Sequence, residues 1–119
     1  MSKKRRDKDF LGDIKEAIDL IASYTKGLPY KKFLNDRKTQ DAVVRNFEVI
    51  GEASKNISAG LKAKYPEIPW KKISGLRDKL IHFYFGIDYK IVWNIAKKEL
   101  PMIVKQIKDI LDKEASNNL

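Results

Sequence analysis

The feature that most constrains the fold is the spacing of apolar residues, which recur three and four positions apart along most of the chain. In the segment from Asp9 to about Lys26 this spacing places the apolar side chains on one face of a helix. These residues are Phe10, Ile14, Ala17, Ile18, Ile21 and Ala22. Gly27 and Pro29 follow and end the pattern. We therefore predict a first helix over about residues 9–26.

A longer pattern of the same kind predicts a second helix that ends near Ser58. Asp36 and Thr39 are the two plausible N-caps, because each side chain can accept a hydrogen bond from a free backbone N–H of the first turn. A short connection is expected from Tyr30 to Asp36. The apolar residues of the second helix are Ala42, Val43, Phe47, Val49, Ile50, Ala53 and Ile57.

Prolines and glycines divide the segment that follows. Residues 61–65 can add a turn or two of helix before Pro66 and Pro69 impose extended backbone on the residues that precede them. Pro69 also suits the first turn of a short helix, which Ser74 and Gly75 interrupt. A third main helix is then predicted from Leu76 to about Phe85.

The last predicted helix begins after Gly86, with Asp88 as its cap, and Pro101 should kink or restart it. No stretch alternates apolar and polar residues with a period of two, so no strand is predicted. The expected fold class is an all-α bundle of four or five helices, forming a single domain over residues 1–119. Residues 1–8 form a basic tail, and residues 114–119 are expected to fray.

The charge balance indicates which kinds of partner suit this chain. Its 25 lysines and arginines exceed its 16 acidic residues and give a formal net charge of +9. Nucleic acid or an acidic protein would be attracted by such a surface. A solvated basic surface without a dedicated ligand explains the charge equally well. Hydrophobic residues at 43% argue against a disordered chain.

Several classes of protein are excluded by what the chain lacks. It contains no cysteine, so disulfides, thiol nucleophiles and the usual structural zinc sites are absent. No signal-peptide pattern is present, and no stretch approaches the roughly 18 apolar residues of a membrane span. We expect a soluble, cytoplasmic protein that makes no contact with a membrane. A metal hydrolase is poorly supported, because there is no second histidine and no recognisable ligand spacing.

The only histidine of the chain is His82, and it lies in the segment from Arg77 to Tyr84. Histidine has the unperturbed pKa best suited to proton transfer near neutral pH. On an ideal helix Asp78 and His82 would form an i, i+4 pair, and Arg77 would lie in line with Tyr84. Any acid–base chemistry of this protein is therefore expected in this segment.

RNA cleavage without a metal ion needs a base for the ribose 2'-hydroxyl, an acid for the leaving 5'-oxygen and a cation beside the phosphate. One histidine can hardly perform both proton transfers. On a helix, moreover, Arg77 and His82 are separated by roughly 140° and about 7.5 Å along the axis. A two-fold dimer would supply a second copy of each. On spacing alone, the alternative of ordinary surface charges and a hydrogen-bonded helix histidine stays open.

Basic and aromatic residues flank this segment. Lys71, Lys72 and Lys79 could contact an RNA backbone, and Trp70 is one of the aromatic residues that could stack on unpaired bases. Packing in the core is the more common role for such aromatic side chains, which also include Phe83 and Phe85.

The pattern Arg77, four residues, His82, one residue, Tyr84 resembles the signature of the HepT-like toxins, a branch of the HEPN (higher eukaryotes and prokaryotes nucleotide-binding) superfamily. Further motifs resemble the family in the same order and cover roughly residues 10–112. These motifs are residues 39–46 (TQDAVVRN), 50–53 (IGEA), 65–70 (YPEIPW), 85–88 (FGID) and Trp93.

The resemblance implies an all-α homodimer of HEPN type that acts as a metal-independent endoribonuclease and needs no cofactor. It implies catalytic roles for Arg77 and His82 at a dimer cleft. It also implies a partner, a minimal nucleotidyltransferase antitoxin, which would neutralise the toxin by transferring AMP to Tyr84. A plain helix residue whose ring packs is the alternative role for Tyr84.

One position departs from the family pattern. The family often has asparagine directly after the signature arginine, and this chain has Asp78. Its carboxylate could orient His82 and favour the protonated imidazole, but it would also repel RNA. A second function therefore stays open, a non-catalytic module that binds a nucleotidyltransferase partner or nucleic acid.

Overall fold

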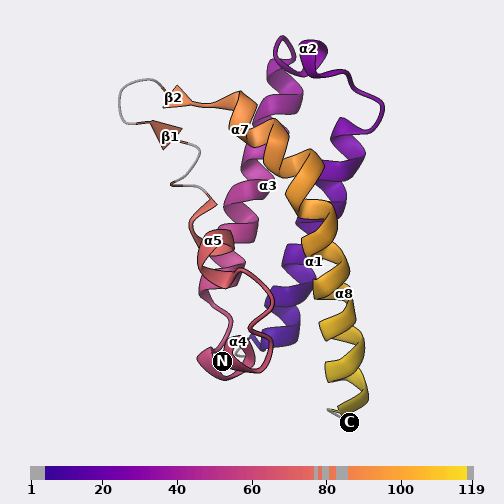
Figure 1. Cartoon of the computed structure of the whole chain (residues 1–119), viewed down its shortest axis with the longest axis vertical. Coiled ribbons are helices and arrows are strands. Elements are labelled where there is room, and N and C mark those ends of the chain that lie inside the picture. The colour runs from indigo at the N-terminus through magenta and orange to yellow at the C-terminus, as the bar shows by residue number, and fades with distance from the viewer. Residues whose placement is uncertain (1–4, 77, 79–80, 83–85, 118–119) are drawn as a thin grey trace.

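The computed structural model describes residues 5–76, 78, 81–82 and 86–117, with the backbone alone at Ile81, His82 and Asn117. Long helices run side by side along the bundle, and a pair of two-residue strands stands at one side of it (Figure 1). In chain order the elements are α1 (Asp7–Thr25), α2 (Tyr30–Phe33), α3 (Arg37–Lys55), α4 (Ala59–Lys64), α5 (Trp70–Ser74), β1 (Ile81–His82), β2 (Gly86–Ile87), α7 (Tyr89–Asn94), the π-helix η1 (Ile95–Glu99) and α8 (Leu100–Asn117).

The predicted all-α fold is confirmed, and the core forms where the apolar stripes meet. α1 packs against α3 and α8, and α3 packs against α5. The side chains with less than 2% exposure at the centre of the bundle include Leu11, Ile14, Phe47, Ile50 and Ile107. Burial of each such side chain contributes about 1.5–3 kcal/mol relative to exposure, so the three long helices hold one another in place.

The capping predictions agree with the structure at α3. Asp36 is the N-cap, and its carboxylate accepts hydrogen bonds from the Thr39 N–H at 3.0 Å and the Thr39 hydroxyl at 2.6 Å. These two bonds, the hydroxyl bond first, lower the pKa of Asp36. Thr39 therefore donates to the cap and lies inside the first turn of α3.

Pro101 restarts the last helix, as predicted, but through a π-helical segment. A proline removes one backbone donor, and its ring clashes with the carbonyl four residues before it. Between α7 and α8 the chain widens into η1, where the Leu100 N–H bonds to the Ile95 carbonyl, five residues back. The wider turn takes up the disruption, so helical structure continues from Tyr89 through Pro101.

The C-terminal segment differs from the expectation of fraying, because α8 continues to Asn117. Glu114 accepts hydrogen bonds from the ammonium of Lys64, at 2.9 Å, and from the hydroxyl of Tyr65. These bonds, the Lys64 bond first, lower the pKa of Glu114. A charged side chain inside the polar tail thus joins the end of α8 to α4. None of the helices described has the length and apolar character needed to cross a membrane.

Candidate functional site

The segment that carries the candidate site lies between α5 and α7, at the side of the bundle where β1 and β2 stand (Figure 1). Arg77 and Tyr84 lie outside the described residues. Asp78 is helical and exposed, and the backbone of His82 forms β1 with Ile81. The antiparallel register pairs Ile81 with Ile87 and His82 with Gly86.

The predicted helix from Leu76 to Phe85 is therefore wrong at Ile81 and His82. β-branched and aromatic residues, which are rich here, favour extended backbone. Gly86 has a φ of 76°, a left-handed conformation that glycine adopts readily, and it lies where the chain returns as β2. Because His82 lies on a strand, it is not an i, i+4 helix partner of Asp78. The helical separation of 140° between Arg77 and His82 likewise does not apply.

The upstream end of the segment is fixed by close packing of α5 on α3. The hydroxyls of Ser54 and Ser74 are hydrogen-bonded at 2.9 Å. A Cβ built on Gly51 would lie 3.4 Å from the Ser74 carbonyl oxygen, so α3 and α5 pack closely enough here that a methyl group at this position would be in contact with α5. Ile73 and Leu76 are buried on either side of this contact. The chain is therefore held against α3 up to Leu76, which directly precedes Arg77 in the sequence.

The downstream end is fixed by a helix cap and an aromatic cluster. Asp88 accepts hydrogen bonds from the N–H groups of Lys90, at 3.0 Å, and Ile91, at 3.3 Å, as predicted for the cap of α7. The ring centroid of Phe33 lies 5.0 Å from that of Trp93 and 6.3 Å from that of Tyr89. Both ends of the segment are thus anchored in the core.

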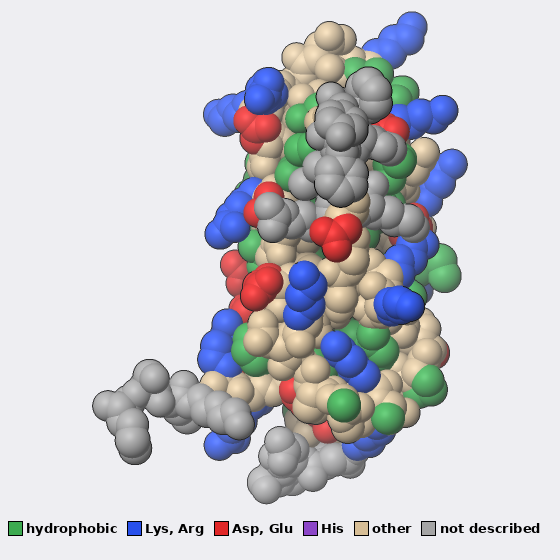
Figure 2. Space-filling view, turned by 90° about the vertical axis from the view of Figure 1, so that its left-hand side faces the viewer, with side chains coloured by type: hydrophobic (Ala, Val, Ile, Leu, Met, Phe, Trp, Pro, Cys, Tyr) green, Lys and Arg blue, Asp and Glu red, His purple; other side chains and the backbone are tan. Residues whose placement is uncertain are grey.

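Charges of both signs surround the segment. Figure 2 shows this face, on which Lys and Arg side chains lie along both edges with Asp and Glu side chains among them. Among the described residues, pKa shifts are resolved for groups in other parts of the molecule, such as Asp36 and Glu114. Among the described residues, no group of three or more histidine or acidic side chains could hold a metal ion.

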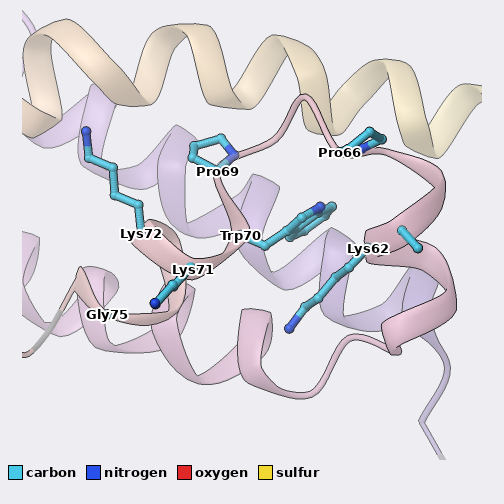
Figure 3. Close-up of a pocket in the computed structure, with 8 residues that line it drawn as sticks. Lys62, Pro66, Pro69, Trp70, Lys71, Lys72 and Gly75 are labelled. Carbon is cyan, nitrogen blue, oxygen red and sulfur yellow. The ribbon is translucent and has the colours of Figure 1, made fainter.

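A groove adjoins the segment on its upstream side, between α4 and α5 (Figure 3). It includes Lys71 and Lys72, two of the three lysines that the sequence analysis suggested as contacts for an RNA backbone. The third, Lys79, lies outside the described residues. Lys72 forms an ion pair with Glu99. Lys62, which sequence reasoning did not single out, lies on the rim. Lys62 lies on α4 and Lys71 on α5, so only the tertiary structure places both in the lining of one groove.

The aromatic residues of this region were correctly assigned to packing where the structure describes them. Trp70 is 8% exposed, and its indole N–H donates to the Tyr65 carbonyl at 2.9 Å. Its ring is held in the wall of the groove and leaves little face for a stacked base. Phe83 and Phe85 lie outside the described residues.

Comparison with known proteins identifies the family of this chain. The model of the ribonuclease HepT-like family matches residues 14–110. This chain belongs to the HepT-like ribonuclease family. The matched range includes most of α1, all of α3, the segment from Arg77 to Tyr84 and most of α8.

Relatives support the same assignment over nearly the whole length. The chain is 50% identical to a Thermococcus cleftensis protein named "Probable ribonuclease HepT", over 84% of this chain and 91% of that one. It is 49% identical to a Methanocaldococcus jannaschii protein named "Putative RNase MJ1216", over 96% of this chain and 98% of that one. No solved structure matches the chain. The resemblance inferred from the sequence motifs is confirmed at the level of the family.

Proposed function

We propose that this chain is the toxin of a toxin–antitoxin pair and that it cleaves RNA without a metal ion. The observation that carries the proposal is the family match over residues 14–110, which includes Arg77, His82 and Tyr84. The names of the two relatives, "Probable ribonuclease HepT" and "Putative RNase MJ1216", support the same reaction class. RNA and ATP occur in the cytoplasm, and we place the activity there.

In the proposed reaction the ribose 2'-oxygen attacks the adjacent phosphorus, and the bond from phosphorus to the 5'-oxygen breaks. A neutral His82 takes the 2'-hydroxyl proton, and a protonated imidazole gives a proton to the departing 5'-oxygen. Arg77 stabilises the crowded phosphate through its planar guanidinium fork. The products are a 2',3'-cyclic phosphate and a free 5'-hydroxyl.

A homodimer supplies the groups that one chain lacks. Each chain contains one histidine, and the reaction needs a base and an acid at the same phosphate. A two-fold axis beside the segment would bring two copies of His82 and Arg77 together. The anchors at Ser74 and Asp88 support this arrangement, because they hold the segment at one side of the bundle where a second copy can meet it.

Cleavage in the presence of a metal chelator tests the reaction. We expect the purified protein to cut single-stranded RNA at an undiminished rate in EDTA, leaving ends that phosphatase cannot process until acid opens the cyclic phosphate. Restoration of activity only by an added divalent ion would contradict the metal-independent mechanism.

We propose that the antitoxin is a minimal nucleotidyltransferase that transfers AMP from ATP to the hydroxyl of Tyr84 and releases pyrophosphate. The added phosphate carries negative charge into the proposed site, where it would repel and block RNA. Intact mass measured after expression with the neighbouring nucleotidyltransferase gene is expected to increase by whole AMP groups. The increase should disappear in Tyr84→Phe, and an increase that persists in Tyr84→Phe would show another acceptor.

A second candidate function rests on Asp78. Its carboxylate is exposed and directly follows Arg77, so it lowers the positive potential that RNA would meet. In this alternative the chain is a non-catalytic module that binds the nucleotidyltransferase or nucleic acid. A tight complex with the partner, no RNA cleavage at any protein concentration and no gain of activity in Asp78→Asn would support it.

A further inference from the structure

We propose that the groove between α4 and α5, here called the lysine groove, binds the backbone of single-stranded RNA next to the candidate site. The proposal rests on the ribonuclease function proposed above and assigns to it a binding surface outside the segment from Arg77 to Tyr84. Lys62 and Lys71 are the residues that we expect to contact phosphate.

The lysine groove has a rigid and largely apolar floor. Its volume is about 930 Å³, and Pro66, Pro69 and Trp70 form much of its lining (Figure 3). The two prolines have restricted backbones, and Trp70 is fixed by its hydrogen bond to the Tyr65 carbonyl. A preformed surface of this kind loses little conformational entropy when a ligand binds.

Positive charge lies on the rim of the groove. Lys62 comes from α4 and is half-buried, Lys71 comes from α5 and is exposed, and both point to the same side of the groove in Figure 3. Neither forms an ion pair within the described part of the chain, whereas Lys72 is paired with Glu99. No carboxylate is among the described residues that line the groove. Two ammonium groups therefore face the same space without local compensation.

The groove leads toward the candidate site. Gly75 lines it, and only the buried Leu76 separates Gly75 from Arg77 in the sequence. The contact of Ser74 with Ser54 fixes α5 on α3 at this point. An RNA strand that lies along the lysine groove would thus have its next nucleotides beside the start of the segment from Arg77 to Tyr84.

Single-stranded RNA fits these features better than the other polyanions. Lysine ammonium groups can follow the phosphates of a strand with any base sequence. The proline floor offers apolar contact to sugars and to unpaired bases, which a duplex keeps inside its stack. An acidic partner protein would match the charge alone, and we treat it as an outcome of the test.

The test combines Lys62→Ala with Lys71→Ala. Binding of a fluorescent, unstructured RNA oligonucleotide is measured by anisotropy with His82→Ala in the background, so that the RNA is not cut. We expect roughly tenfold weaker binding at physiological salt. The plot of the logarithm of the association constant against the logarithm of the salt concentration has a negative slope. Its magnitude should decrease by about 1.4, since each of the two lost phosphate contacts to a single strand contributes about 0.7. With His82 present, KM should rise and kcat should stay unchanged.

The matched control is Lys105→Ala combined with Lys108→Ala, which removes the same charge from α8. The side-chain amide of Gln106 donates a hydrogen bond to the backbone carbonyl of Glu67, and Glu114 accepts one from Lys64. This side of α8 therefore faces α4 and the loop that follows α4. Lys105 and Lys108 lie roughly 100° and 160° around the helix from Gln106. Their loss should change the salt slope little.

Three results would contradict the proposal that the lysine groove binds RNA. They are unchanged binding in the Lys62 and Lys71 variant, an equal loss in the α8 control, and a loss of binding to the nucleotidyltransferase with RNA binding intact. A failure of the proposed function is a distinct result. In that case the wild type does not cleave RNA, while RNA binding still depends on Lys62 and Lys71.

Discussion

Replacement of His82 by alanine is expected to reduce the rate of RNA cleavage by at least about a hundredfold, the lower end of what a general acid or base contributes. The effect should be large because the chain contains no other histidine that could take over the proton transfer. The backbone pair between His82 and Gly86 does not depend on the side chain, so the fold should persist. Cleavage is measured on labelled RNA under single-turnover conditions, with circular dichroism of the variant as the check on folding.

Mixing experiments extend this prediction to the dimer. If both proton transfers require His82 from two chains, a wild-type chain paired with a His82→Ala chain has an incomplete site. An excess of His82→Ala protein, refolded together with wild type, should therefore lower the activity below that of wild type diluted by the same factor. Cleavage that is unaffected by the excess would show that each chain acts alone. Equal cleavage by wild type and His82→Ala would remove His82 from the mechanism.

Phe33→Ala is expected to lower the free energy of unfolding by about 3–5 kcal/mol, the usual cost of removing a buried phenylalanine ring. Phe33 has no exposed surface, and its ring packs against Tyr89 and Trp93 of α7. The substitution leaves a cavity at the point where α7 is held to α2 and α3. Urea unfolding followed by circular dichroism measures the change.

The neighbouring residue provides the control for this prediction. Leu34 follows Phe33 directly and is 41% exposed. Leu34→Ala should therefore change the free energy of unfolding by no more than about 0.5 kcal/mol. Equal destabilisation by the two substitutions would mean that the aromatic cluster does not anchor α7. Because α7 also holds the downstream end of the candidate segment, Phe33→Ala should reduce RNA cleavage more than Leu34→Ala does.

The sequence predicted the long helices well and the short elements less well. α1, α3 and α8 each contain several turns, so their apolar residues repeat often enough to show the helical period. α2 has only four residues and was expected to be a connection, because one turn cannot display a period. Gly51 belongs to the motif at residues 50–53, and a glycine inside a helix can indicate close packing. The spacing of apolar residues along the chain could not show that Ile73 and Ser74 are the residues packed against it.

By itself the sequence determined the all-α class and carried the motifs of the HepT-like ribonuclease family. It also narrowed the cap of α3 to Asp36 or Thr39 and marked Pro101 as the point where the last helix kinks or restarts. These features depend on local periodicity, on the hydrogen bonding of single residues and on ordered motifs. Only the tertiary structure decided that His82 lies on a strand and that Lys62 and Lys71 line the same groove. The strand depends on the backbone pairing of His82 with Gly86, and the groove depends on residues that come from different helices. The helical spacing of apolar residues contains no information about the strand pairing or about the groove.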